Sequence, residues 1–247
     1  MIITPDWSAP QNVRAAITCR EGGMSQGVYS TWNMGTHVQD DAEAVIENRK
    51  KLIAQLQLKK NPQWLEQIHG NKVVEAVDDQ RVRTADACFT RETGLACAVM
   101  TADCLPVLLC DTQGTQVAAV HCGWRSLSQS ILEKTLQQFA DPTQVMAYLG
   151  PAISKQHFEV GIDVLEAFFE SSKTSEQTDQ IAAAFTPSKR PLYFYADIYA
   201  LARAELNGLG VHQIFGGNEC TFANKERFYS YRRDGITGRM ASLIWLV

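Results

Sequence analysis

The sequence predicts an α+β fold, a single layered domain of mixed β-sheets flanked by helices that spans residues 1–247. Three observations favour this class. Short apolar runs typical of strands recur along the chain, a few helical patterns stand between them, and the two do not alternate strictly as in a doubly wound fold. No repeat, low-complexity segment or linker rich in proline, glycine or serine marks a domain boundary.

Four helices are predicted, and the ends of two of them carry clear signals. The first begins at Asp40 and Asp41, which are good N-terminal residues, and the last ends before Gly208 and Gly210. The polar stretch 171–180 is expected to be a surface loop or a ragged helix end. The predicted helices are 41–57, 126–139, 161–170 and 195–207, and the predicted strands are 13–19, 72–77, 95–100, 105–110, 116–121, 144–149, 211–215 and 240–246.

Composition narrows the class of protein. Hydrophobic residues make up 45% and charged residues 20%, which is enough for a sizeable core. The net charge of −4 does not indicate a surface that binds nucleic acid or an anionic membrane. No signal peptide and no apolar run of about 20 residues is visible. The seven cysteines form no C-x-x-C pair, which suits reduced thiols. We therefore expect a cytoplasmic protein, monomeric by default.

Three side chains suited to binding a metal stand at the ends of strand-like runs. Cys104 precedes one apolar run, His121 ends another, and His69 lies upstream beside Gly70. Each of the three, taken alone, is more often a structural residue, but together they offer one thiolate and two imidazoles. Zinc prefers this donor set and copper also accepts it. Three protein ligands leave a fourth position open, which is typical of a catalytic zinc and predicts an enzyme.

The alternative from a different functional class is a non-catalytic metal- or nucleotide-binding module. Such a module requires a closed site with four protein ligands, which is the norm for structural zinc. Cys122, directly after His121, is one residue that could fill the fourth position. Because neighbouring residues of a strand face opposite sides, Cys122 could equally point away from the site and be inert.

Five arginines are candidates for binding an anion. Arg49 falls on the apolar face of the first predicted helix, where it needs an anionic partner, a position at the rim of the core, or a phosphate or carboxylate ligand. Arg232, Arg233 and Arg239 frame a glycine-bearing turn. That turn is either a solvated hairpin tip or, with Arg49 and Arg125, one wall of an anion-accepting cleft.

The remaining candidates rest on position. Asp103 stands beside Cys104, where it is either a general acid/base or the residue that caps the turn. His37, His157 and His212 carry weaker signals, because a histidine in a loop is more often simply exposed. The signatures of dinucleotide folds, Walker A loops, nucleophile elbows, zincins and zinc deaminases are all absent.

Several longer runs occur in the order found in one known family. They are LEQIHG, VMTADCLPVLL, VAAVHCGWRS, YLGPAIS, FEVG, DIYALAR and FYSYRRDGITGRMASLIWL. With them the chain resembles the YfiH/laccase-domain family from about residue 10 to its C-terminus, and it is especially similar to the enterobacterial YfiH proteins. The resemblance implies a single layered α+β domain.

The resemblance also implies roles for individual residues. His69, Cys104 and His121 match the family's metal ligands, Asn33 and Arg49 match positions near its pocket, and Arg49 is implied to contact phosphate. The family usually has a small residue, commonly alanine, where this chain has Cys122. Family members are described as copper polyphenol oxidases, as zinc-dependent purine nucleoside phosphorylases that also deaminate adenosine, and as peptidoglycan editing factors.

These descriptions are not equally compatible with the residues. A multicopper oxidase needs a histidine-rich centre, and this chain has only five histidines, although a single His₂Cys copper site is conceivable. We therefore expect a zinc-dependent purine nucleoside phosphorylase acting on adenosine, inosine, guanosine and methylthioadenosine, with phosphate as co-substrate and with adenosine deaminase activity. The main alternative is a zinc amidase that removes L-Ser from the UDP-muropeptide precursor UDP-MurNAc-L-Ser, and the sequence does not separate the two.

Overall fold

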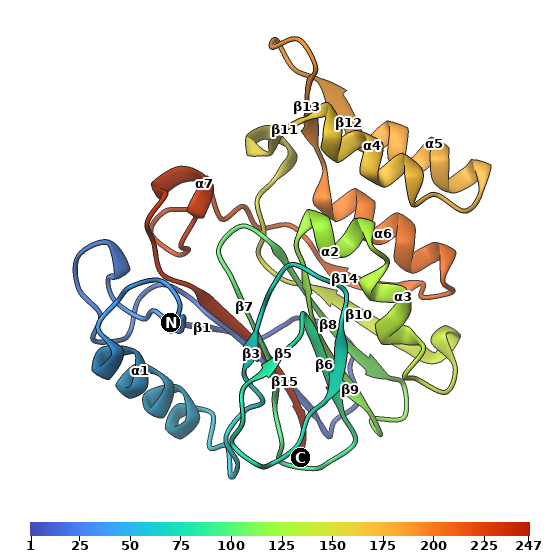
Figure 1. Ribbon diagram of the computed structural model, residues 1–247. Coiled ribbons are helices and arrows are strands. Elements are labelled where there is room, and N and C mark those ends of the chain that lie inside the picture. Colours follow the sequence, from blue (N-terminus) through green and yellow to red (C-terminus); the bar gives the residue numbers. More distant parts are fainter.

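The computed structural model describes residues 1–247, and two β-sheets packed face to face form its centre (Figure 1). The larger sheet has the strand order β14-β10-β8-β9-β6-β4, in which β8 pairs antiparallel with both β9 and β10 while the two edge strands pair in parallel. Its strands are β4 (Val73–Glu75), β6 (Ala87–Thr90), β8 (Leu105–Asp111), β9 (Val117–Cys122), β10 (Val145–Leu149) and β14 (Gln213–Gly216).

The smaller of the two central sheets is antiparallel, with the order β1-β2-β15-β7. Its strands are β1 (Ile2–Ile3), β2 (Val13–Thr18), β7 (Cys97–Thr101) and β15 (Met240–Leu246). Apolar side chains that alternate along the strands of both sheets share one core, with Val99 and Ile244 from the smaller sheet and Leu108 and Val117 from the larger. The two sheets therefore form a sandwich.

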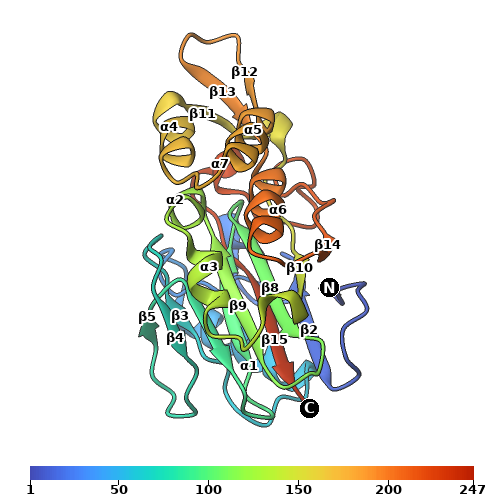
Figure 2. The ribbon, with the colours of Figure 1, turned by 90° about the vertical axis from the view of Figure 1, so that its right-hand side faces the viewer.

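Helices cover both outer faces of this sandwich, which gives four layers (Figure 2). Helix α1 (Ala42–Gln55) packs Leu52 against the smaller sheet beside Met100 and Trp245. On the larger sheet, Val107 and Val120 belong to the core that includes the helices α2 (Trp124–Ser128), α3 (Ile131–Leu136) and α6 (Ile198–Gly208). The layered α+β class predicted from the sequence is confirmed.

A further group of elements stands beyond one end of the sandwich, at the top of Figure 1. It is built from helices α4 (Ile162–Glu170) and α5 (Ser175–Ala184) and the antiparallel sheet β11-β13-β12, with strands β11 (Glu159–Gly161), β12 (Phe185–Pro187) and β13 (Tyr193–Ala196). The remaining elements are the pair β3 (Leu65–Glu66) and β5 (Arg83–Thr84), helix α7 (Tyr231–Asp234), and the short 3-10 helices Gly27–Tyr29, Pro142–Gln144 and Lys155–His157. No helix has the length and apolar character needed to cross a membrane.

The structure corrects two predicted segments. The helix predicted at 126–139 is broken into α2 and α3, because Ser130 adopts a left-handed conformation with φ 61° between them. The stretch 171–180 is not a loop throughout, since α5 begins at Ser175 with the side chain of Thr174 capping its N-terminus. The strand β6 and the small sheet β11-β13-β12 are not among the predicted strands.

The β8–β9 hairpin explains how residues 17 positions apart meet. Its register pairs Pro106 with His121 and Leu105 with Cys122, so the residue before β8 lies beside the end of β9. Cys104 is that residue. Strand pairing alone therefore brings Cys104 next to His121 at one end of the sandwich.

Candidate metal centre

His69, Cys104 and His121 form a compact cluster. Their potential ligand atoms all lie within 4.8 Å of one another, Cys104 Sγ lies 4.0 Å from His69 Nε2, and the two imidazole rings meet edge to face with centroids 4.8 Å apart. His121 is buried, Cys104 half-buried and His69 exposed. The cluster predicted from three separate sequence runs is thus assembled, and it has a side open to solvent.

A buried carboxylate, Asp86, orients two of the three side chains. Asp86 Oδ1 accepts a hydrogen bond from the backbone N–H of His69 at 2.9 Å and lies 2.8 Å from His121 Nδ1. With Nδ1 engaged in this way, His121 presents Nε2 to the cluster. The other carboxylate oxygen accepts from the N–H groups of Ile68 and Gly70 at 3.3 and 2.8 Å. These bonds hold His69 in its left-handed conformation, with φ 58°.

At position 123, next to the cluster, there is room only for a glycine. A Cβ atom added at Gly123 would lie 3.1 Å from His69 Cδ2 and 3.2 Å from Cys104 Sγ. Both separations are tighter than ordinary van der Waals contact, so a side chain here would displace the cluster. Two imidazoles and a thiolate with a carboxylate behind one imidazole are the donor set and support that zinc uses in proteins. The residues present therefore fit a metal ion.

The charges within the cluster favour the form that binds metal. Burial alone would raise the pKa of the Cys104 thiol, but the neighbouring imidazoles of His121 and His69 lower it to about 6. Burial alone would lower the pKa of His121, but Cys104 and Asp86 raise it to about 9. Both shifts favour a thiolate beside an imidazolium in the free protein, and a metal cation would take the place of the imidazolium proton.

An apolar cavity of about 230 Å³ opens on one side of the cluster. Trp124, Ile153, Phe158 and Ile198 supply its apolar lining, and the guanidinium of Arg125 lies 4.3 Å from the Trp124 ring centre. Flat aromatic ligands suit such a lining, because their faces can stack on Trp124 and Phe158.

A second, polar cavity of about 400 Å³ also opens at the cluster and shares His69 and Cys104 with the apolar one. His37, Gln67 and Arg239 line it together with His69, Cys104 and His121. Arg239 donates from Nη1 to the carbonyls of Thr237 and Gly238, which leaves its Nε and Nη2 groups without a protein acceptor. Burial lowers the pKa of Arg239, and burial together with the charges of Arg239 and Arg49 lowers the pKa of His37. An anion would find unshared donors here.

Arg49 and Asn33 support the wall of the polar cavity from behind. Arg49 donates to the Met34 carbonyl from Nε and Nη2 and lies over the Trp64 ring at 4.0 Å, with no carboxylate partner. Burial lowers its pKa to about 10. Asn33 accepts from the backbone N–H of Arg239 at 2.9 Å. The structure places neither side chain among those that line the cavity.

Of the other predicted anion-binding residues, two line a cavity and one does not. Arg125 and Arg232 line the apolar cavity. Arg233 lies away from both cavities, and its donors are taken by three backbone carbonyls and by Asp234. Since all five of its N–H groups have acceptors, Arg233 braces the segment before β15.

Asp103 lines the apolar cavity, but its carboxylate is already engaged. It accepts from Thr221 Oγ1 at 2.6 Å, from Ser230 Oγ at 3.0 Å and from the backbone N–H of Arg232 at 2.7 Å. The residue is buried and adopts φ 98°. These contacts anchor the turn that carries Cys104 to the C-terminal part of the chain.

The remaining histidines and Cys122 lie apart from the ligand cluster. His157 contacts Cys220 and stacks on Phe222, and His212 lies near Asn207. Cys122 is fully buried in the core between the larger sheet and its helices. Its neighbour His121 faces the cluster, as the alternation of a strand requires.

Sequence reasoning overlooked Asp86 and gave too little weight to His37. The signal for Asp86 was a single carboxylate in the apolar run at 85–89, where a charge must have buried partners. His37 is distant in sequence from the other residues of the site, and only the fold brings it to the polar cavity.

Comparison with known proteins finds relatives over the whole chain. The sequence model of the family described as multi-copper polyphenol oxidoreductase laccase matches residues 14–247. A purine nucleoside phosphorylase of Pseudomonas aeruginosa is 49% identical over 99% of this chain and 98% of its own length. The purine nucleoside phosphorylase YfiH of Escherichia coli is 46% identical over 100% and 99%.

Solved structures agree with these matches. A Neisseria meningitidis protein of the DUF152 family superposes with a TM-score of 0.92 at 48% identity, covering 99% of this chain and 98% of the other. The Bacillus licheniformis protein YfiH superposes with a TM-score of 0.87 at 27% identity, covering 95% and 93%.

Proposed function

Because the chain belongs to the multi-copper polyphenol oxidoreductase laccase family, and its relatives include proteins named purine nucleoside phosphorylases, we propose that it is a zinc-dependent purine nucleoside phosphorylase. One observation carries the proposal. The His69–Cys104–His121 cluster lies where an apolar cavity with an aromatic wall meets a polar cavity with unshared cationic donors. A purine nucleoside and phosphate need these two environments side by side.

The two cavities divide the substrates between them. The purine base stacks in the apolar cavity against Trp124 and Phe158, and phosphate binds to Arg239 and His37 in the polar cavity. Tyr231 lines both cavities, so the ribose of the nucleoside, between the base and the phosphate, lies beside it. Phosphate is thereby held close to the anomeric carbon, where its oxygen forms the new bond to C1′ as the bond from C1′ to N9 breaks and the base leaves with a proton taken up from water. Positioning of two substrates is in itself a large part of such a rate enhancement.

His69, Cys104 and His121 would hold the metal, and an ion bound there supplies a Lewis acid at the junction of the cavities. Asp86 keeps His121 and His69 in place, while Asn33 and Arg49 support the wall that carries Arg239. Adenosine, inosine, guanosine and methylthioadenosine are the substrates that we propose for it. The same apolar cavity gives adenosine access to the cluster, and we include adenosine deamination in the proposal.

The number of available donors opposes a multinuclear copper centre. His69 and His121 are the histidines of the one group of three metal-binding side chains, His37 lines the polar cavity beside them, and His157 and His212 lie outside both cavities. Copper oxidases that reduce dioxygen need several ions, so the residues support a single metal. Zinc is the ion we propose, because two imidazoles and one thiolate with an open fourth position match its catalytic sites.

The test combines metal analysis with a chromatographic assay. We expect close to one zinc per chain, release of hypoxanthine from inosine only when phosphate is present, and conversion of adenosine to inosine. The Cys104→Ala variant should fold but retain less than about 1% of the activity and little metal. The matched control is Cys220→Ser, because Cys220 is the other half-buried cysteine and lies outside both cavities.

Variants in the two cavities separate the substrates. Arg239→Met should raise the KM for phosphate about tenfold or more with a smaller change for inosine, and Trp124→Ala should do the reverse. A fully active Cys104→Ala protein, or a zinc-loaded protein that leaves every nucleoside unchanged, would overturn the proposal.

A further inference from the structure

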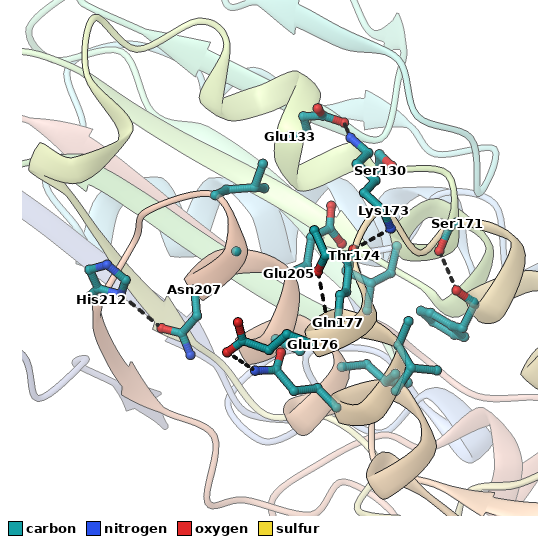
Figure 3. Close-up of a pocket in the computed structure, with 18 residues that line it drawn as sticks. Ser130, Glu133, Ser171, Lys173, Thr174, Glu176, Gln177, Glu205, Asn207 and His212 are labelled. Atoms are coloured by element: carbon teal, nitrogen blue, oxygen red, sulfur yellow. Dashed lines mark hydrogen bonds and ion pairs between the residues drawn. The ribbon is translucent and has the colours of Figure 1, made fainter.

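A second pocket lies away from the metal centre, between the helices α3, α4, α5 and α6 (Figure 3). Its volume is about 640 Å³, within the range of small-molecule sites, and it shares no lining residue with the two cavities at the cluster. Nothing in the proposed reaction uses it.

The acidic groups of this pocket outnumber the basic ones. Glu133, Glu176 and Glu205 line it, against one lysine, Lys173. Lys173 Nζ lies 2.5 Å from a carboxylate oxygen of Glu133, and Gln180 Nε2 donates to Glu176 at 3.5 Å. Figure 3 shows Lys173 reaching across to Glu133, with Asn207 and His212 at the other side of the pocket. Glu205 is the carboxylate without a side-chain donor.

Glu205 is the unusual member of this group. Its Oε1 atom is buried and has no hydrogen-bond partner, although the backbone N–H of Glu133 lies close to the carboxylate. Burial raises the pKa of Glu205 to about 8, and the nearby charge of Glu133 adds to the effect while Lys173 opposes it. A buried polar atom without a hydrogen-bond partner costs free energy, so a ligand that donates to Glu205 would gain binding free energy by supplying that partner.

The rest of the lining limits the shape and polarity of such a ligand. Leu127, Phe168, Ile181 and Leu201 form an apolar floor of buried side chains. Hydroxyl and amide groups, including those of Ser130, Thr174 and Gln177, supply the polar wall. The carboxylates do not converge into a group that would hold a metal ion. The combination suits an aliphatic stem that carries a positively charged donor.

We propose that this pocket binds a small aliphatic amine of the diamine or polyamine class, with Glu205 as the counter-ion of one ammonium group and the floor of Leu127, Phe168, Ile181 and Leu201 against the methylenes. The ammonium group donates to the Glu205 carboxylate, which has no side-chain donor in the free protein. Lys173 already neutralises Glu133 in the same way, so the ligand repeats an interaction that the pocket contains once. Glu176 and His212 at the pocket edge stay accessible to the second amine.

Calorimetry on the metal-containing protein tests this directly, with butane-1,4-diamine and spermidine as probes and butane-1,4-diol as the uncharged control. We expect saturable binding of both amines, none of the diol, and release of protons near pH 7.5 because Glu205 must ionise to pair with an ammonium group. Proton release is measured by repeating the titration in buffers of different ionisation enthalpy.

Variants assign the binding to this pocket. Glu205→Gln keeps the side-chain shape, and it should weaken amine binding at least about tenfold and abolish proton release. Glu166→Gln removes an exposed carboxylate of α4 that does not line the pocket, and it should change neither. Cys104→Ala excludes binding to the metal, so amine binding should survive it. Absence of saturable binding, or equal binding by wild type and Glu205→Gln, overturns the proposal.

Discussion

Asp86 behind the metal cluster and Glu205 in the wall of the second pocket both have buried carboxylate oxygens, yet their surroundings act on them in opposite directions. Burial by itself would raise the pKa of Asp86, but His121 and the N–H groups of Gly70 and Ile68 bring it below its usual value. Burial raises the pKa of Glu205 to about 8, because no comparable set of donors surrounds it. The number of donors, more than burial, therefore decides whether a buried carboxylate is charged.

The difference also separates two kinds of site. Around Asp86 every charge has a partner, and the result is a rigid support that fixes two imidazoles in one orientation. Around Glu205 the protein leaves one oxygen without a partner. A site of the first kind is organised before any ligand arrives, whereas a site of the second kind gains most when a ligand completes it.

The largest expected effect comes from Asp86→Asn. The amide group would turn its NH₂ toward backbone N–H donors that now point at a carboxylate oxygen. We expect metal affinity to fall about 10–100-fold, because the orientation of His121 is lost. We also expect the free energy of unfolding to fall by about 3–5 kcal/mol, as for other broken buried pairs. Competition with a chelator and urea unfolding measure the two effects.

Glu75→Gln is the control for this experiment, because Glu75 is an exposed carboxylate on β4 with only a 3.8 Å contact to Arg91. It should change neither quantity by more than about 0.5 kcal/mol. If Asp86→Asn bound metal as tightly as wild type, the inference that the Asp86 carboxylate orients His69 and His121 for metal binding would be wrong.

A smaller and pH-dependent effect is expected from Glu205→Gln. The folded-state pKa of about 8 lies above the unfolded value of about 4.3, so the folded protein holds the extra proton between these limits. The stability contributed by this proton is full below pH 4 and is lost as the pH rises through 8. The variant lacks this loss and should be more stable than wild type at pH 9 by about 1–3 kcal/mol, and similar to it at pH 5.

Unfolding by urea from pH 5 to 9 measures this difference. Glu133, Lys173 and Cys122, the other titratable groups near Glu205, are unchanged in the variant, so the difference between the two curves reports on Glu205. Parallel curves would mean that Glu205 is charged and paired at neutral pH. Addition of butane-1,4-diamine at pH 9 should bring wild type closer to the variant, which connects this measurement with the proposed ligand.

The two regions also differ in how far the sequence predicted them. Cys104 and His121 are predictable because one precedes an apolar run and the other ends one, and the β8–β9 register then forces them together. The roles of the arginines are harder to predict, because Arg233 and Arg239 stand six residues apart in similar sequence surroundings. Only the backbone geometry decides that Arg233 donates to nearby carbonyls while Arg239 lines the polar cavity. The pocket at Glu205 was not predicted, since its wall includes α5, a helix in a polar stretch that reads as a loop.

The smallest expected effect is that of Cys122→Ala, and it decides a question that the sequence left open. Cys122 is fully buried on the helix side of β9, and this burial, with smaller contributions from nearby acidic groups, keeps its pKa well above the ordinary value. Its side chain faces the core on the opposite side of the strand from His121 and stands outside the group of His69, Cys104 and His121, so we expect it not to act as a metal ligand. The variant should keep its metal content and activity and lose about 1 kcal/mol of stability through the small void that it leaves. Loss of the metal instead would mean that Cys122 closes the coordination sphere as a fourth ligand, which is the arrangement of a structural site, and the enzymatic proposal would then lose the open position on which it depends.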